Sequence, residues 1–308
     1  MTHVDNGNIP KSSNVRNSFR HFLLRHPYLN PYGFTTDRFV RNVSMHFRLL
    51  PDFLIIGYHK CGTTSLYNYL IQHPNIGKAS RKEIQYFSMS FFRGDNWYRS
   101  HFPTMHTKKN IEIKTNEKFI TGEATPQYIY HPLSLERIQK TLPGVKLILL
   151  LRNPIDRAYS HYMHQKRSGN EKIETFEEVI ELDENRHKSM FENFKKNKIK
   201  EYNHKFFLPP YVSMGKYYLQ VKKLLDTFSN KNILILELQE LNDSPEEITN
   251  KTFNFLGVSN KKNLNYRKEN VGKYDKINPN TRDKLIEFYK PYNFELEKLL
   301  GKKFDWNR

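Results

Sequence analysis

The fold of this chain follows from residues 51–70, which read Pro-Asp-Phe-Leu-Ile-Ile-Gly-Tyr-His-Lys-Cys-Gly-Thr-Thr-Ser-Leu-Tyr-Asn-Tyr-Leu. The apolar run at 53–56 predicts a short buried strand, and the hydroxyl-bearing segment from residue 63 predicts an amphipathic helix. Gly57 and Gly62 bracket the turn between them, and glycine lets a ligand approach the backbone closely. The first free amides of the helix point at such a ligand, with the positive end of the helix dipole behind them. The stretch therefore predicts an anion-binding turn.

The position of the lysine in this turn indicates which kind of anion it holds. The turn matches the first half of the nucleotide triphosphatase pattern G-x-x-x-x-G-K-[ST], but Thr63 occupies the place of the lysine, and Lys60 lies inside the turn instead. The apolar run at 145–151 is followed by Arg152 rather than by an acidic residue that would organise Mg²⁺. Both departures favour a phosphate-type ligand that protein cations and amides hold without a metal.

Composition indicates one domain with a basic extension. A chain of 308 residues is long enough for one large α/β domain or two smaller ones. Residues 1–44 are polar and basic and show no sustained hydrophobic period, whereas hydrophobic order begins near Phe47. We therefore expect a flexible N-terminal extension over 1–44 and a single domain over 45–308.

Hydropathy and cysteine content bear on the compartment. No stretch approaches ~18 consecutive apolar residues, and the N-terminus lacks the apolar core of a signal peptide, so we expect a cytoplasmic protein without a membrane span. The single cysteine, Cys61, excludes an internal disulfide and a multi-cysteine zinc site. Because it lies in the turn beside Lys60, Cys61 is either a thiol with a lowered pKa or a small side chain that fills space.

The charge balance points to anionic partners. Fifty Lys and Arg against 32 Asp and Glu give a formal charge of +18, which creates a positive field around the molecule. Nucleic acid is one such partner, but the basic residues are spread along the chain and show no zinc-finger or basic-zipper spacing. We therefore expect a small anionic ligand rather than a specific nucleic acid.

Strand-like and helix-like segments alternate along the chain. The apolar runs at 53–56, 145–151 and 233–238 predict buried parallel strands. Helices are predicted between and after them, at about 63–73, 132–141, 154–168, 175–190, 213–229, 245–256 and 279–290. This alternation predicts a doubly wound, mostly parallel α/β sheet in a three-layer αβα arrangement, with ligands at the carboxyl ends of the strands. Segments 91–118 and 191–212 are expected to be long loops or lids.

A second anion site is predicted beside the turn. Arg152 directly follows a strand, so it emerges at the same edge of the sheet as the turn. Asp156, Ser160 and His164 follow at steps of four and share a helix face, with Arg157 beside Ser160. A hydroxyl and a guanidinium there are suited to a second phosphate. The alternative interpretation is that Asp156 and Arg157 form ordinary surface pairs and that His164 is a satisfied polar residue.

Several ordered motifs together resemble one enzyme family. The motifs are the stretch 51–70, Lys-Glu-Ile-Gln-Tyr-Phe at 82–87, Gly-Asp-Asn-Trp-Tyr at 94–98, Gly-Glu-Ala-Thr-Pro at 122–126, Leu-Leu-Arg-Asn-Pro-Ile-Asp-Arg-Ala-Tyr-Ser at 150–160, Gly-Lys-Tyr-Tyr at 215–218 and Leu-Gly-Lys-Lys-Phe-Asp-Trp at 300–306. In these motifs the chain resembles the sulfotransferases that use 3′-phosphoadenosine-5′-phosphosulfate (PAPS), and within them the carbohydrate branch of heparan sulfate enzymes and bacterial relatives.

This resemblance implies roles for matching positions. The 5′-phosphosulfate of the donor corresponds to the turn, with Lys60, Cys61, Gly62, Thr63, Thr64 and Ser65. The 3′-phosphate corresponds to the pair Arg152 and Ser160, and Tyr217 belongs to a further donor-binding motif. Gly272 and Lys273 resemble a glycine-basic loop that closes over the donor. The product PAP would leave from the same positions, and no metal is expected.

The resemblance also implies a catalytic group and a class of acceptor. Glu83 matches the carboxylate that serves as base in the heparan enzymes, His164 matches a histidine near their reaction centre, and Lys60 would stabilise the leaving phosphate. The acceptor would be a hydroxyl or an amine of a glycan or a small hydroxylated molecule. Its pocket is expected from the two variable segments, whose candidate residues are His101, Lys195, Lys196 and His204.

Two departures concern the acceptor side. The heparan enzymes carry a disulfide-closed loop that this chain cannot form with one cysteine, and they place a lysine where this chain has Ala124. Two other classes stay open on the residues alone: a metal-dependent phosphotransferase of the P-loop type, and a non-catalytic basic protein that binds nucleic acid.

Overall fold

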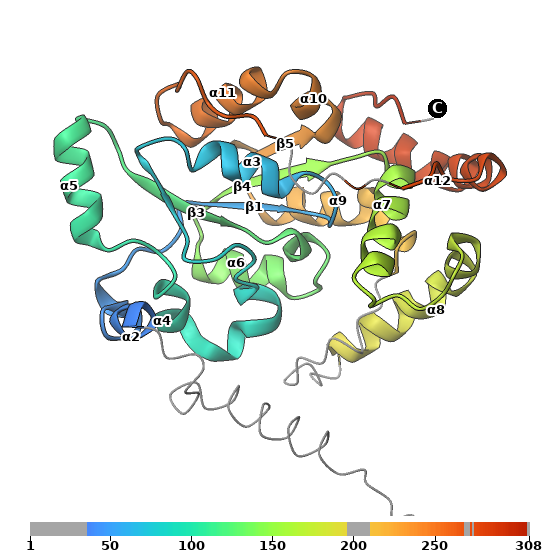
Figure 1. The fold of residues 1–308 in the computed structure, drawn as a ribbon, viewed down its shortest axis with the longest axis horizontal. Helices are drawn as coiled ribbons and strands as arrows, with labels where there is room; N and C mark the ends of the chain where they lie inside the picture. Colours follow the sequence, from blue (N-terminus) through green and yellow to red (C-terminus); the bar gives the residue numbers. More distant parts are fainter. Residues whose placement is uncertain (1–35, 196–209, 268–271, 273, 307–308) are drawn as a thin grey trace, which may run out of the picture.

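The fold is built on a sheet of parallel strands, seen edge-on in the computed structural model of Figure 1. The structure describes residues 36–195, 210–267, 272 and 274–306. Within them, the strand order is β2-β3-β1-β4-β5, and every strand pairing in the sheet is parallel. The bounds are β1 Phe53–Gly57, β2 Ile76–Lys78, β3 Ile120–Ala124, β4 Lys146–Leu151 and β5 Ile233–Glu237.

The two central strands explain why the sheet forms here. Every residue of β1 is buried, and so is β4 after its first residue, which fits continuous apolar runs covered on both faces. Their register places Ile55 beside Ile148 on one side and beside Ala124 of β3 on the other. The carboxyl ends of β1, β3 and β4 therefore meet at one edge of the sheet.

Helices cover both faces of the sheet, which makes three layers (Figure 1). Helices α3, α10 and α11 lie over one face, and α6 and α9 lie over the other. The helices are α2 Thr36–Val43, α3 Thr63–Leu70, α4 Gly94–Arg99, α5 Met105–Thr115, α6 Ser134–Thr141, α7 Pro154–Arg167, α8 Phe176–Lys195, α9 Tyr217–Thr227, α10 Leu238–Asp243, α11 Pro245–Leu256 and α12 Pro279–Leu300. The predicted doubly wound α/β class is confirmed.

The topology places a ligand-binding crevice beside β1. After β1 the chain passes to the edge strand β2 and returns through β3, and it then crosses to β4 and β5 on the opposite side. In such sheets the crevice lies outside the carboxyl ends of the strands where the winding reverses. The turn after β1 and the residue after β4 both lie at this position.

Several sequence predictions about elements were wrong. The prediction of strands missed β2 and β3, and the segment 91–118, which we expected to be a long loop, contains α4 and α5. The last helix does not end near Lys290 but continues through Pro291 to Leu300. Helix α8 extends to Lys195, and most of the other predicted loop, at 196–209, lies outside the described residues.

The described end of the N-terminal extension is helical. Helix α2 lies in the last part of the segment 1–44 that we expected to be flexible, and residues 1–35 lie outside the described part of the chain. Among the described residues, no helix is long and apolar enough to cross a bilayer. The cellular location that we predicted stays a prediction.

Candidate functional site

A cleft of about 620 Å³ lies at the carboxyl edge of the sheet. It is formed by the turn after β1, the segment before Tyr86, the start of α3, Arg152 after β4, and residues of α7 and α10. Its lining consists of His59, Lys60, Gly62, Thr63, Thr64, Ser65, Lys82, Glu83, Pro126, Arg152, Ser160, His164, Leu238, Asn242, Gly272 and Tyr274. Most of the residues predicted for the two phosphate sites and for the base thus surround one space.

The turn takes a backbone shape that glycine permits. Gly62 has φ +85°, in the left-handed region, and a Cβ there would lie 2.5 Å from Leu238 Cδ1. Gly62 is also the residue before the first turn of α3, so no side chain there caps the first amides of this helix. The first amides of a helix have no acceptor within the helix, and those of α3 lie at its positive end, beside the hydroxyls of Thr63 and Thr64. The turn can bind an anion through backbone and hydroxyl donors together.

Two cations from different strands meet at this turn. Arg152 Nη1 donates to the carbonyl oxygen of Lys60 at 3.1 Å, and the Tyr217 hydroxyl donates to the carbonyl oxygen of Arg152 at 3.0 Å. Burial, and then the nearby Arg152, lowers the pKa of Lys60. Two positive charges held this close repel each other in a partly buried site, and an anion between them removes that repulsion.

Helix α7 brings the second set of predicted residues to the cleft. Asn153 caps the helix by accepting from the amides of Ile155 at 2.9 Å and Asp156 at 3.4 Å. Ser160 and His164 then line the cleft from one face of α7. Burial, and then the charge of Lys60, lowers the pKa of His164. The face predicted from the spacing of four is therefore the one that reaches the cleft.

The alternative interpretation, that Asp156 and Arg157 form ordinary surface pairs, is right for one of these residues and wrong for the other. Asp156 forms a surface ion pair, with Arg282 Nη1 2.8 Å from its Oδ1. Arg157 does not: it is fully buried beneath the turn and donates to the carbonyl oxygen of Tyr211. The interpretation of Arg157 as a surface residue was wrong, because helix α7 packs its Arg157 side against the core rather than against solvent.

Glu83 lies opposite the start of α3 and is bridged to it by Lys82. The Lys82 ammonium donates to Thr64 Oγ1 at 2.5 Å and to Glu83 Oε1 at 2.9 Å. Burial raises the pKa of Glu83, but His59 and Lys82 lower it by more, so the carboxyl titrates below its ordinary value of 4.5. Glu83 is therefore an ionised carboxylate at neutral pH and is able to accept a proton.

His59 is a member of the site that the sequence analysis missed. It lines the cleft, and its ring lies 5.0 Å from that of His161 on α7. Burial lowers the pKa of His59, although the charge of Glu83 opposes this shift. A neutral imidazole beside a carboxylate can donate a hydrogen bond to a bound molecule or accept one from it. In the sequence, the one indication that His59 belongs to the site is its position directly before Lys60.

Two predicted donor-binding residues, Cys61 and Tyr217, do not line the cleft, and a third is not among the described residues. Cys61 is fully buried, and burial raises the pKa of its thiol, so the interpretation as a thiol with a lowered pKa was wrong. Tyr217 is buried behind Arg152 and supports it, as described above. Lys273 lies outside the described residues, whereas its neighbours Gly272 and Tyr274 line the cleft.

The candidates for the acceptor pocket are not brought together. His101 Nδ1 lies 2.7 Å from Ser80 Oγ, and its ring contacts Trp97 rather than the cleft. The side chain of Lys195, and Lys196 and His204 entirely, lie outside what the structure describes. The lining of the cleft includes two other histidines, His59 and His164.

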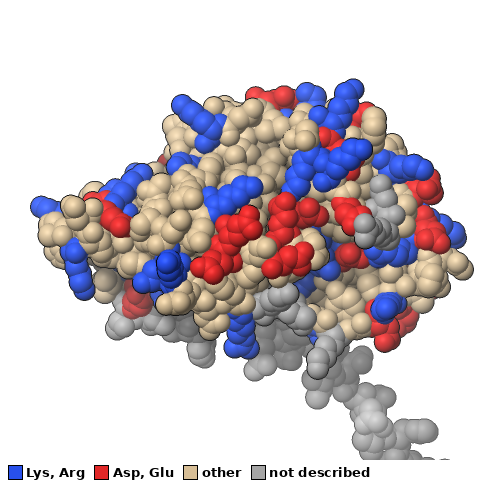
Figure 2. Space-filling model, turned by 90° about the horizontal axis from the view of Figure 1, so that it is seen from above, with Lys and Arg blue, Asp and Glu red and all other residues tan. Residues whose placement is uncertain are grey.

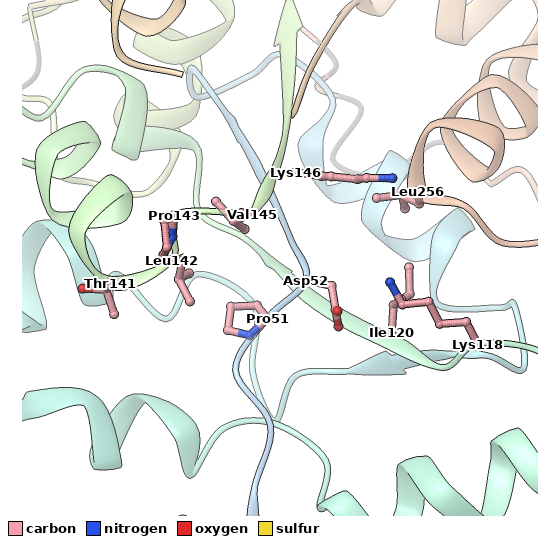
Figure 3. Close-up of a pocket in the computed structure, with 11 residues that line it drawn as sticks. Pro51, Asp52, Lys118, Ile120, Thr141, Leu142, Pro143, Val145, Lys146 and Leu256 are labelled. Carbon is pink, nitrogen blue, oxygen red and sulfur yellow. The ribbon is translucent and has the colours of Figure 1, made fainter. Parts of the chain in front are cut away.

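A second pocket, of about 300 Å³, lies at the opposite, amino edge of the sheet (Figure 3). Asp52, Lys118 and Lys146 line it from the segments that lead into β1, β3 and β4. Asp52 Oδ2 already accepts from the Thr121 amide at 2.9 Å, and Lys146 Nζ donates to the Phe255 carbonyl at 2.5 Å. Since both groups serve the fold, the carboxyl-edge cleft is the better candidate site.

Surface charge and potential metal ligands bear on the two alternatives from the sequence, a nucleic-acid-binding protein and a metal-dependent phosphotransferase. On the face seen in Figure 2, Lys and Arg are separated by Asp, Glu and uncharged residues rather than gathered into one band. A nucleic-acid site usually presents a basic patch or stripe, and this face does not have one. Among the described residues, no group of three or more His, Cys, Asp and Glu is arranged to hold a metal ion.

The parallel sheet and the cationic cleft at its carboxyl edge define an α/β fold whose cleft is suited to phosphate-type ligands. The chain belongs to the sulfotransferase domain family, which matches it over residues 50–284. The family resemblance predicted from the motifs is thereby confirmed.

Two curated relatives and one solved structure illustrate the similarity. Membrane-associated sulfotransferase kil1 of Dictyostelium discoideum is 29% identical over 320 residues, covering 83% of this chain and 66% of that protein. Bifunctional heparan sulfate N-deacetylase/N-sulfotransferase 4 of Mus musculus is 28% identical over 282 residues, covering 82% of this chain and 30% of that protein. A crystal structure of a sulfotransferase from Alicyclobacillus acidocaldarius is 28% identical, with a TM-score of 0.63, over 84% of this chain and 100% of its own. The chain therefore spans only part of the curated relatives.

Proposed function

We propose that this protein transfers the sulfuryl group of PAPS to a hydroxyl or an amine of a carbohydrate acceptor. The observation that carries the proposal is the convergence of the donor-rich turn, Lys60, Arg152 and the ionised Glu83 on one cleft. Family membership supports sulfate transfer, and the cleft supplies cations and amides in place of metal ligands.

In this proposal the donor's two phosphates occupy separate parts of the cleft. The 5′-phosphosulfate binds at the turn, to the amides at the start of α3 and to the hydroxyls of Thr63, Thr64 and Ser65. The 3′-phosphate binds between Arg152 and Ser160, the two residues that flank the first turns of α7. Gly272 and Tyr274 line the same cleft, where they can contact the nucleoside.

The chemistry is an in-line transfer between two oxygens, or from an oxygen to a nitrogen. The bond between sulfur and the 5′-phosphate oxygen breaks, the bond from sulfur to the acceptor atom forms, and the acceptor's proton passes to Glu83. Lys60 and the amides of the turn stabilise the negative charge that develops on PAP as it leaves. His164 and His59 lie where they can orient the acceptor.

The carbohydrate assignment rests on relatives rather than on the cleft. The relative from Mus musculus is named as a bifunctional heparan sulfate N-deacetylase/N-sulfotransferase, and its match covers 82% of this chain. Residues 45–308 form the proposed catalytic domain, which the family match at 50–284 supports.

The proposal is tested by incubating the purified protein with ³⁵S-labelled PAPS and a panel of acceptors in buffer with EDTA. The panel contains N-desulfated heparin, neutral glycans and small alcohols. We expect label to pass to a glycan at a rate that EDTA does not reduce, because the cleft activates the donor with cations of the protein.

Two outcomes would contradict the proposal. Phosphoryl transfer from ATP that needs Mg²⁺, without use of PAPS, would indicate a phosphotransferase. Salt-sensitive DNA or RNA binding that survives Lys60→Ala and Arg152→Ala, in a protein that transfers no label, would indicate a nucleic-acid-binding protein.

A further inference from the structure

The backbone that presents Glu83 is held in an unfavourable conformation. Glu83 has φ +57° and Gln85 has φ +59°, so two non-glycine residues out of three lie in the left-handed region. Each such residue costs free energy and persists only where its surroundings hold it in place. The segment 83–85 therefore needs partners outside itself, and the direction of the Glu83 side chain depends on them.

Those partners are three consecutive residues at the end of β3. The Glu83 amide donates to the carbonyl oxygen of Ala124 at 3.1 Å, and the Gln85 amide donates to Thr125 Oγ1 at 3.3 Å. The Ile84 amide between them donates to the carboxylate of Glu123. All three amides of the strained segment are thus fixed by Glu123, Ala124 and Thr125.

Glu123 is itself fixed by a fully buried set of donors. Its Oε1 accepts from the hydroxyls of Tyr128 at 2.7 Å and Tyr98 at 3.1 Å, and its Oε2 accepts from Thr125 Oγ1 at 2.6 Å. With the Ile84 amide, these donors match the roughly four acceptor sites of an ionised carboxylate. Burial raises the pKa of Glu123, and the hydrogen bonds from Thr125 and Tyr128 oppose that shift.

Thr125 connects this buried carboxylate to the segment. Its hydroxyl oxygen accepts from the Gln85 amide, so its hydrogen is directed to Glu123. Neither Glu123 nor Thr125 lines the cleft, and both side chains are buried. They can affect the cleft through the position of residues 83–85, and Thr125 also directly precedes Pro126, which lines the cleft.

We infer that Glu123 and Thr125 are positioning residues that hold the left-handed segment 83–85 so that the Glu83 carboxylate faces the acceptor. This inference rests on the proposed function, in which Glu83 is the base. Misplacing a reacting group by about 1 Å can cost on the order of 100-fold in rate. A loosened segment would therefore lower the rate of transfer while the donor-binding turn, which belongs to other elements, stays intact.

The test compares two threonines of the same strand region. Thr125→Val removes the hydroxyl that links Glu123 to Gln85, and Thr121→Val removes an equally buried hydroxyl that donates to the Gly77 carbonyl at 2.6 Å, away from the cleft. We expect Thr125→Val to lower kcat about 10-fold to 100-fold, with the KM for PAPS and the affinity for PAP unchanged. Thr121→Val should leave kcat unchanged, and Thr125→Ser should restore it.

A second readout does not depend on activity. Hydrogen exchange of the amides of residues 83–85 should become faster in Thr125→Val and stay slow in Thr121→Val. Should Thr125→Val fail to fold, Tyr128→Phe, which removes one donor to Glu123, takes its place and should lower kcat in the same direction. The inference would be overturned if Thr121→Val and Thr125→Val had equal kcat and equal hydrogen exchange. Where Tyr128→Phe replaces Thr125→Val, an unchanged kcat in Tyr128→Phe would overturn it.

The outcome for Glu83 separates this inference from the proposed function. If Glu83→Gln transfers sulfate at the normal rate, the proposed base is wrong and the inference loses its premise. If Glu83→Gln is inactive but Thr125→Val behaves like Thr121→Val, the base stands and only the positioning role is wrong.

Discussion

Glu83→Gln is expected to lower the rate of sulfuryl transfer by about 10² to 10⁴-fold, the usual contribution of a positioned general base. The amide cannot accept the acceptor's proton, whereas the shape of the side chain is kept. PAP affinity should stay nearly unchanged, because the cations and amides proposed to bind the two phosphates belong to the turn, α3 and Arg152. The measurement is a label-transfer assay alongside calorimetric binding of PAP.

Glu174→Gln is the matched control for this variant. Glu174 also pairs with a lysine, Lys166 Nζ at 2.8 Å, but it does not line the cleft. The control should keep the normal rate. A normal rate in Glu83→Gln, or an equal loss in both variants, would show that Glu83 is not the base.

The pH profile of the same reaction separates Glu83 from His164. Because the pKa of Glu83 lies below its ordinary value of 4.5, the carboxylate is present at neutral pH and is lost only as the pH falls through that lowered pKa. The acid limb of kcat/KM should therefore lie below pH 4.5. An acid limb in the imidazole range that disappears in His164→Ala would assign the base to His164 instead.

Arg152→Ala and Lys60→Ala are expected to have large but different effects. Removing a charged hydrogen-bond partner of a phosphate costs about 1.5–3 kcal/mol, or roughly 10-fold to 150-fold in affinity. Arg152→Ala should lower PAP affinity by that amount, because Arg152 is proposed to bind the 3′-phosphate in both PAPS and PAP. Lys60→Ala should lower kcat by more than it lowers PAP affinity, because its proposed charge stabilisation grows as the phosphate leaves.

Lys118→Ala is the control for a loss of overall positive charge. Lys118 lines the amino-edge pocket of Figure 3, at the other end of the strands. Its removal changes the net charge by the same amount and should change neither PAP affinity nor kcat. Equal losses in all three variants would mean that the general positive field, rather than the cleft, binds the donor.

The strands that the sequence predicted and the strands that it missed differ in how they are stabilised. β1, β4 and β5 are continuous apolar runs, so their composition alone predicts buried strands. β3 reads Ile-Thr-Gly-Glu-Ala and is nevertheless fully buried. Its Glu123 is tolerated there because Tyr98 and Tyr128 supply hydrogen bonds, and nothing in the pattern of the strand itself predicts these partners.

Two helices were missed or shortened for other reasons. α5 has no buried residue, so it lacks the apolar stripe on which helix prediction depends, although Thr104 caps it by accepting from the Thr107 amide. α12 continues past Pro291, where proline usually interrupts a helix. The packing of Leu296 on the far side of this proline outweighs the lost hydrogen bond, since Leu296 is fully buried in the core.

The site was predictable where it follows ordered motifs and not where it depends on tertiary contacts. The turn, Arg152, Ser160 and His164 lie next to strand ends or on one helix face, so their spacing places them together. Leu238 and Asn242 reach the cleft only because β5 ends beside β4. The motif at 82–87 includes Lys82, but its spacing does not predict that the Lys82 ammonium joins Thr64 to Glu83.

The central claim, that the cleft binds the sulfate donor through two phosphate sites, is tested most directly by a crystal structure of the protein with PAP. We predict the 5′-phosphate against the amides and hydroxyls at 63–65, with Lys60 beside it, and the 3′-phosphate between Arg152 and Ser160. PAP bound outside this cleft, or no bound PAP at millimolar concentration, would contradict the account.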